Sequence, residues 1–185
     1  VQKAFESLNE TVKLSNHPND IKSATHLIVP GQGAFNQIMT QLSSKNLIKP
    51  LTEYIKSGKK FLGICLGFQI LFESSLEFGT HKGLGIFPGS LKKIETPNLK
   101  VPHMGWNQCN IQNDSHMFSN ISNNTHVYFV HSYYLTATTP NIVASTTVYG
   151  EEFVSSIQHN NIWATQFHPE KSGDVGIQLL KNFLK

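Results

Sequence analysis

The first half of the chain alternates apolar runs with stretches of helical spacing. Apolar residues at positions 1, 4, 5 and 8 predict an opening helix with one buried face, and residues 12–14 predict a short strand. Residues 26–29 and 61–64 are short, largely apolar runs that predict buried strands. Helices are expected over residues 35–42, 48–55 and 68–72. Strands that alternate with helices in this way indicate parallel pairing in a sheet covered on both sides.

Beyond Gly83 the chain changes to short strands separated by turns, which indicates antiparallel ribbons. Strands are expected over residues 91–94, from 101 onward, and over 126–130, 142–148, 153–157 and 162–167. Residues 175–184 have helical spacing and predict a closing helix. Since no repeat and no linker divides the sequence, it predicts one α/β domain spanning residues 1–185.

The composition narrows the class of protein. The 185 residues carry a net charge of +3 with only 15% charged residues, and the basic ones are scattered. A nucleic-acid surface would gather them into a patch, so no nucleic-acid partner is expected. No apolar run is long enough to span a bilayer, so no membrane association is expected. Two cysteines are too few for a disulfide scaffold, which favours a cytoplasmic location.

Residues 63–67 carry the strongest chemical signal. They read Gly-Ile-Cys-Leu-Gly between a predicted strand and a predicted helix, which is the pattern of a nucleophile elbow. Because glycines permit a strained turn, the side chain of Cys65 is expected to project at the carboxyl end of its strand. The helix that follows directs its amino end at the sulfur, which favours thiolate over thiol. A plain packing turn is the alternative interpretation.

A nucleophilic thiol needs a base, and the end of a later strand supplies a candidate. His168 can exchange protons with Cys65, while Glu170, two residues further on, can fix the tautomer of the imidazole. Backbone amides for a developing oxyanion are expected from the glycine turn after a third strand, formed by Gly31, Gln32 and Gly33. The three segments are expected to meet at one edge of the sheet.

The other sulfur and imidazole groups receive plainer interpretations. Cys109 lacks flanking glycines and is expected to be a small buried hydrophobe. Most of the nine histidines are interpreted as surface or hydrogen-bonded side chains. No Cys-x-x-Cys or His-Glu-x-x-His motif is present, so no metal is expected. Asn36 stands where a dinucleotide fingerprint would need its third glycine, so no cofactor is expected.

Together these motifs resemble the three signatures of the class I glutamine amidotransferases: Pro-Gly-Gln-Gly at residues 30–33, Gly-Ile-Cys-Leu-Gly-Phe-Gln at 63–69 and His-Pro-Glu at 168–170. The resemblance implies a triad of Cys65, His168 and Glu170 without a cofactor. It also implies a three-layer, flavodoxin-like α/β fold whose mixed sheet has a mostly parallel core and antiparallel ribbons. The oxyanion donors are implied to be the backbone amides of Gln32 and Leu66. The implied glutamine contacts are Gln69 and the segment His131, Ser132 and Tyr133.

Longer motifs resemble, more narrowly, the glutaminase subunits of imidazole glycerol phosphate synthase in histidine biosynthesis. Residues 30–35, 102–107 and 168–172 carry this likeness, which runs across nearly the whole chain. It implies a heterodimer with a barrel-shaped cyclase subunit that uses the ammonia released from glutamine. Met104, Trp106 and Lys171 are then implied at the interface, although ordinary core packing is the alternative for Met104 and Trp106. A glutaminase of another synthase and an inactive partner-binding subunit remain open.

Two departures from the family pattern stand out. Gln32 occupies a position where the family usually has an aliphatic residue; only its backbone is needed, so activity is expected to survive. Family chains also begin with a buried strand and a Gly-Asn loop before the helix that opens here at Val1. The fold expected is therefore one that apparently lacks its first strand, and the chain alone is expected to be unstable or poorly active.

Overall fold

Three parallel strands form one end of the main sheet. The computed structural model describes residues 1–112 and 115–185. β1 (His26–Gly31) pairs with β2 (Lys60–Cys65), and β2 pairs on its other side with β11 (Ile162–Thr165), both in parallel register. Every residue of β2 after Lys60 is buried because helices cover both faces of the sheet. The parallel pairing and the burial of β2 are confirmed, but the predicted burial of residues 26–29 is wrong, because β1 lies at the edge of the sheet and none of its residues is fully buried.

Further strands, most of them paired antiparallel, extend this core. β10 (Glu151–His159) pairs with β11 and continues the sheet towards β8 (Tyr133–Leu135), β5 (Phe87–Lys93), β3 (Phe72–Ser75) and β4 (His81–Lys82). A branch runs from β10 to β9 (Val143–Tyr149), β6 (His103–Ile111) and β7 (Thr125–His131). The mixed sheet and its ribbons beyond Gly83 are confirmed. The short strands β3, β4 and β8 were not predicted.

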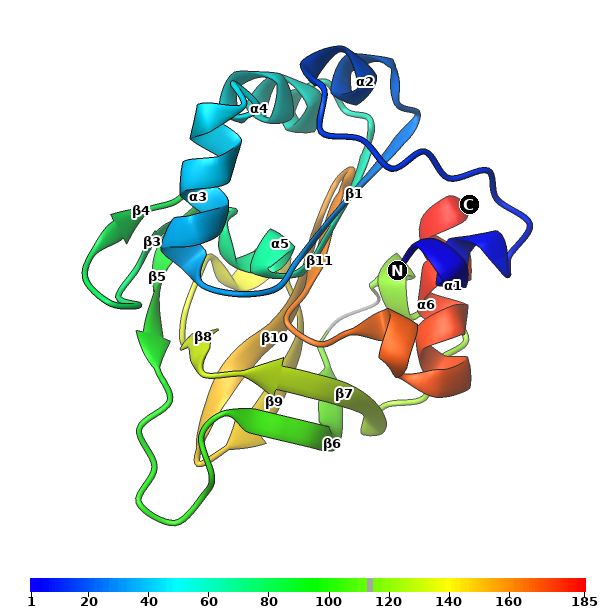
Figure 1. Ribbon diagram of the computed structural model, residues 1–185. Coiled ribbons are helices and arrows are strands. Elements are labelled where there is room, and N and C mark those ends of the chain that lie inside the picture. The colour runs from blue at the N-terminus through cyan, green and yellow to red at the C-terminus, as the bar shows by residue number, and fades with distance from the viewer. Residues whose placement is uncertain (113–114) are drawn as a thin grey trace.

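Helices pack on both faces of the parallel strands and give three layers (Figure 1). On one face α1 (Gln2–Glu6) and α6 (Gly173–Leu184) form a core with Leu62 and Ile64 of β2. On the other face α3 (Phe35–Ser44), α4 (Ile48–Lys56) and α5 (Leu66–Gln69) form a second core with Phe61. Neighbouring residues of a strand point to opposite faces, so β2 contributes to both cores. α2 (Pro18–Ser23) adds Ile21 to the second core, and short 3-10 helices lie at His116–Phe118, Pro140–Ile142 and Pro169–Lys171.

The strand predicted over residues 12–14 is wrong. This segment is irregular, and the side chain of Leu14 is 83% exposed because no strand in the described ranges pairs with it. An apolar run forms a strand only where a neighbouring strand accepts its hydrogen bonds.

The helix predicted over residues 68–72 is also wrong in its extent, because α5 is a single turn and Phe72 already belongs to β3. The backbone amides of Leu84 and Ile86 donate to the carbonyl oxygens of Ile70 and Leu71, each at 2.8 Å, and these bonds draw the chain out of the helix. The other predicted helices are confirmed within a few residues. No helix in the described part of the chain has the length and apolar character needed to cross a bilayer.

Candidate active site

The turn between β2 and α5 holds Cys65 in a strained backbone conformation. Cys65 has φ 55° and ψ −104°, which an L-residue adopts only where its surroundings enforce it. Glycine is required on both sides. A Cβ on Gly63 would touch the carbonyl oxygen of Gly67, and a Cβ on Gly67 would overlap the carbonyl oxygen of Val29 in β1. The turn therefore has the geometry expected of a nucleophile elbow.

The Cys65 thiol is buried beside polar groups. Its side chain is 7% exposed, and Sγ lies 3.7 Å from Nε2 of Gln166 and 3.9 Å from the carbonyl oxygen of Val130. Burial raises the pKa of Cys65 to about 12. The backbone N–H of Leu66, at the amino end of α5, lowers this pKa but does not outweigh the burial. Because desolvation dominates, the resting group is a neutral thiol that needs a base to remove its proton.

We expect alkylation of Cys65 in the resting protein to accelerate with pH and to reach no plateau near neutrality. The thiolate is the reactive form, and below the pKa its fraction rises about tenfold per pH unit. Mass spectrometry of iodoacetamide labelling against pH measures this. The fully buried Cys109 serves as the internal control for unfolding. A plateau near neutral pH would instead reveal a preformed thiolate–imidazolium pair.

His168 and Glu170 form a buried pair next to the elbow. Nδ1 of His168 lies 2.9 Å from Oε1 of Glu170. Burial raises the pKa of Glu170, but the hydrogen bond and the charge of His168 outweigh it and hold the pKa below its usual value. The ionised carboxylate fixes a proton on Nδ1. Nε2 of His168 is buried with no hydrogen-bond partner among the described residues, so this nitrogen can accept a proton.

The end of β11 and the start of α6 hold His168 in position. Thr165 aligns with Ile64, so residues 166–168 continue beside the elbow. The backbone N–H of His168 donates to the carbonyl oxygen of Tyr128 at 2.9 Å. The buried hydroxyl of Ser172 donates to the carbonyl oxygen of His168 at 2.7 Å and accepts from the N–H of Tyr128 at 3.0 Å. One hydroxyl thus joins the histidine segment to β7.

Replacing Ser172 by alanine is expected to lower the free energy of unfolding by about 1–3 kcal/mol, because it leaves the partly buried N–H of Tyr128 without its acceptor. Chemical denaturation measures the loss. The control is Ser44→Ala on the exposed surface of α3, which is expected to change stability by less than about 0.5 kcal/mol. Equal stability of the two variants would contradict this role for Ser172.

The glycine turn after β1 lies directly beside the nucleophile. The parallel register aligns Gly31 with Cys65, so Gln32 and Gly33 leave the sheet at the carboxyl end next to the sulfur. A Cβ on Gly31 would lie 2.6 Å from the Cβ of Leu66, which shows how closely this loop approaches α5. Gln32 and Leu66 therefore both line the cavity beside Cys65.

A cavity of about 510 Å³ opens over Cys65. The predicted site residues that line it are Gln32, Gly33, Cys65, Leu66, Gln69, Met104, His131, Ser132, Tyr133, His168 and Lys171. Gly31, Glu170 and Trp106 lie outside the lining. In the described part of the chain no hydrogen bond joins the Cys65 sulfur to His168, although both side chains border the same cavity.

Sequence reasoning missed two polar side chains at this site. Gln166 is fully buried; its Oε1 accepts from Nε2 of Gln69 at 2.9 Å, and its Nε2 donates to Cys65. A glutamine inside an otherwise apolar run was the available signal. Glu77 lines the cavity and accepts a hydrogen bond from the backbone N–H of Phe35 at 2.6 Å. No local pattern marks it, because the loop after β3 reaches the site only through the fold.

Comparison with known proteins agrees with this geometry. A protein-family model described as glutamine amidotransferase class-I matches residues 2–185. The chain belongs to this family. It is 43% identical to the "Imidazole glycerol phosphate synthase subunit HisH" of Syntrophotalea carbinolica, over 99% of this chain and 92% of that one. It is 44% identical to the protein of the same name from Rhodopirellula baltica, over 99% and 89%.

Solved structures confirm the fold of this class I amidotransferase. A "crystal structure of glutamine amidotransferase" superposes with a TM-score of 0.75 at 15% identity, covering 100% of this chain and 92% of that one. A structure from Thermoplasma acidophilum, described as that of a GMP synthase protein, superposes with a TM-score of 0.73 at 19% identity, covering 98% and 83%. The expected α/β fold class is therefore confirmed.

The amidotransferase domain presents an exposed apolar face beside its cavity. Met104 and Trp106 of β6 are 62% and 56% exposed, so core packing is the wrong interpretation for them. The Trp106 ring contacts the Tyr128 ring edge-on at 6.2 Å between centroids. Nζ of Lys171 lies 5.7 Å from the centroid of the Tyr128 ring. The three side chains expected at an interface thus lie at one rim of the cavity.

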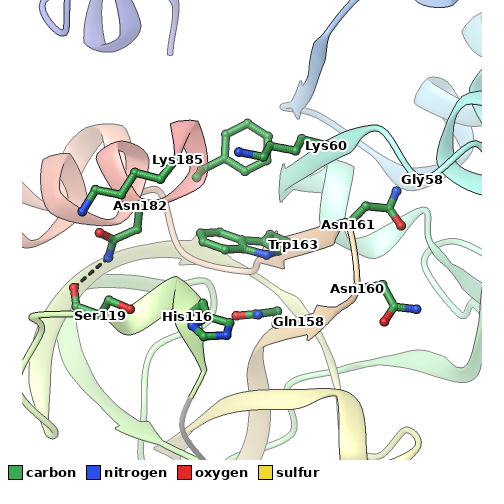
Figure 2. A pocket seen from close by; sticks show the side chains of 11 residues that line it. Gly58, Lys60, His116, Ser119, Gln158, Asn160, Asn161, Trp163, Asn182 and Lys185 are labelled. Carbon is green, nitrogen blue, oxygen red and sulfur yellow. Dashed lines mark hydrogen bonds between the residues drawn. The ribbon is translucent and has the colours of Figure 1, made fainter.

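A second cavity, of about 530 Å³, lies at the other end of the parallel strands (Figure 2). Its lining includes Lys60, the first residue of β2, and Trp163 of β11. Figure 2 shows the Trp163 indole in the middle of this cavity, with His116 and Gln158 below it. No cysteine or carboxylate side chain occurs among the described residues that line it. Cys65 and His168 line the first cavity and not this one.

Proposed function

We propose that this class I amidotransferase is the glutaminase subunit of an imidazole glycerol phosphate synthase. It hydrolyses glutamine to glutamate and ammonia through a cysteine thioester. The observation that carries the proposal is a strained Cys65 and a buried His168–Glu170 pair that border one cavity. The names of its relatives support the choice of pathway.

Acylation begins when glutamine places its side-chain amide over Cys65. The free Nε2 of His168, which borders the same cavity as the sulfur, takes the thiol proton as the S–C bond forms. Negative charge on the amide oxygen meets the backbone amides of Gln32 and Leu66. Glu170 stabilises the imidazolium that results. His168 then gives its proton to the departing nitrogen, so ammonia leaves and a glutamyl thioester remains.

Deacylation reverses the roles of the same groups. Nε2 of His168 removes a proton from water, the carbon–oxygen bond forms at the thioester, and the C–S bond breaks. The proton returns to the sulfur, and glutamate leaves. No cofactor takes part in this cycle.

The charges around the cavity suit a free amino acid. Glu77 supplies a carboxylate and Lys171 an ammonium group at the cavity wall, which complement the two charged groups of a zwitterion. Ser132 and Tyr133 line the same cavity and add polar groups to its wall. Gln69 donates to the carbonyl oxygen of Tyr133 at 3.1 Å, so it supports the segment that would hold glutamine.

The partner that we propose is a barrel-shaped synthase, the cyclase subunit, which receives the ammonia in a heterodimer. Met104, Trp106 and Lys171 form the interface, because exposed apolar and cationic side chains gather there next to the cavity. We place the reaction in the cytoplasm, since Cys65 and Cys109 are both free thiols and the mechanism requires Cys65 to remain reduced.

The decisive experiment supplies glutamine to the chain mixed with the cyclase subunit. Formation of glutamate and imidazole glycerol phosphate is the expected result. Substituting Trp106 by alanine should weaken the complex by at least about 1 kcal/mol, as removal of a large aromatic interface residue commonly does. Glutamate release without cyclase product would indicate another synthase. Failure of a glutamine-analogue electrophile to label Cys65 in the complex would indicate an inactive binding subunit.

A further inference from the structure

Two buried histidines lie on the neighbouring strands β6 and β7. The ring of His103 stacks between the rings of Phe129 and Tyr149, at centroid distances of 4.8 Å and 3.9 Å. His131, on the neighbouring strand β7, lies opposite His103 in the register. The two imidazoles are hydrogen-bonded, with Nδ1 of His103 3.0 Å from Nε2 of His131. The proton transfers described above use neither ring.

The partners of the two rings give their hydrogen bonds a single direction. Nδ1 of His131 lies 3.0 Å from the carbonyl oxygen of Tyr133, which can only accept, so Nδ1 carries the proton. Nε2 of the neutral ring must then accept from Nδ1 of His103. Nε2 of His103 in turn accepts from Nδ2 of Asn107 at 3.2 Å. Burial lowers the pKa of His103 to about 4 and that of His131 to about 3, which keeps both rings neutral.

The same chain of bonds continues to the sulfur. The carbonyl oxygen of Tyr133 also accepts from Nε2 of Gln69 at 3.1 Å, and this amide donates its other hydrogen to Gln166. Nε2 of Gln166 donates to Cys65 Sγ at 3.7 Å. Each donor thus has a defined acceptor from Asn107 on β6 to the nucleophile.

We propose that His103 and His131 are positioning residues, which act as a hydrogen-bond relay that fixes the Tyr133 carbonyl oxygen and through it orients the amides of Gln69 and Gln166 beside the Cys65 sulfur. Without the bond from His131, the Tyr133 carbonyl oxygen is no longer fixed in position. Gln69 and then Gln166 can shift with it, and the Cys65 sulfur loses its donor. Because the relay starts on the strand that exposes Met104 and Trp106, it joins that face physically to the nucleophile. The inference deepens the proposed function of the Cys65 site.

The test compares phenylalanine and asparagine at each histidine position. His131→Phe keeps an aromatic ring in the core but removes both nitrogens, whereas His131→Asn keeps an N–H where Nδ1 stood and can still donate to Tyr133. His103→Phe and His103→Asn form the matched pair one step further from the sulfur. The melting temperature of each variant measures its stability. The rate of Cys65 alkylation by iodoacetamide, across a range of pH, measures the reactivity of the thiol.

We expect both phenylalanine variants to fold and to be alkylated about tenfold more slowly at each pH, because the thiolate loses hydrogen-bond support worth roughly one pKa unit. Each asparagine variant should stay within about twofold of the parent rate. The charged and titratable groups that face the sulfur, His168, Glu170 and Lys171, are unchanged in all four variants. Alkylation rates that fall equally in the two members of a pair, or in neither, overturn the relay.

The same experiment separates this inference from the proposed function. The rate of alkylation by iodoacetamide reports the reactivity of the Cys65 thiol whether or not glutamine is the substrate. A chain that failed to hydrolyse glutamine would therefore still show the difference between phenylalanine and asparagine if the relay exists. A chain that hydrolysed glutamine without that difference would keep its function and lose the relay.

Discussion

Substituting Cys65 by serine is expected to reduce glutamine hydrolysis by about a thousandfold or more, because the hydroxyl is a far weaker nucleophile at neutral pH than a thiol that His168 can deprotonate. In the complex with the cyclase subunit proposed above, synthesis driven by an added ammonium salt should persist. Measuring both activities on the same preparation makes the comparison internal.

The matched control is Cys109→Ser. Cys109 is fully buried, and its sulfur lies 3.7 Å from the hydroxyl of Ser155, so a serine there finds a hydrogen-bonding partner and leaves the catalytic cavity untouched. This variant should keep its glutaminase activity. If Cys65→Ser instead abolished both the glutamine-dependent and the ammonium-dependent reactions, the substitution would have damaged folding or assembly, and its effect could not be credited to the nucleophile.

Gly67→Ala is expected to have the largest effect on stability, lowering the free energy of unfolding by about 3 kcal/mol or more. The added Cβ overlaps the carbonyl oxygen of Val29, and this oxygen belongs to a paired strand backbone that cannot move aside cheaply. Chemical denaturation or thermal melting measures the loss, and the soluble yield should fall with it.

Gly58→Ala separates this steric effect from the backbone cost of replacing glycine. Gly58 has φ +80°, yet nothing lies within 4 Å of its added Cβ, so only the left-handed conformation is penalised, at about 1 kcal/mol. The two alanine variants should therefore differ by roughly 2 kcal/mol or more. Equal stabilities would show that α5 can withdraw from β1 without penalty.

Local signals were sufficient for the parts of the structure that neighbouring residues determine. The elbow at residues 63–67 was predictable because glycine, nucleophile and glycine lie within one turn, and His168 and Glu170 because both follow one strand. The parallel core followed from two apolar runs and the helices after them. In each case the physical cause lies within a few residues of its effect.

The remaining features depend on contacts between distant segments. β8 forms because Leu135 pairs with Leu91 of β5 on one side and Val154 of β10 on the other. The sequence of three residues does not indicate such pairing. Glu77 accepts a hydrogen bond from Phe35, which lies 42 residues earlier in the sequence, so only the fold brings Glu77 to the cavity. The relay through His103 and His131 was equally hidden, because it requires two strands in a fixed register. Residues 12–14 show the converse, because no strand among the described residues pairs with this Val-Lys-Leu segment.

The burial of Cys65 has a consequence for the durability of the protein. Peroxide attacks thiolates, and a neutral thiol with 7% of its side chain exposed offers it little to attack. Between turnovers the nucleophile should therefore resist oxidation to the sulfenic acid. Cys65 is open to oxidation only during the brief interval in which its proton has moved to the imidazole of His168. During that interval the bound amino acid occupies the cavity through which an oxidant would reach the sulfur.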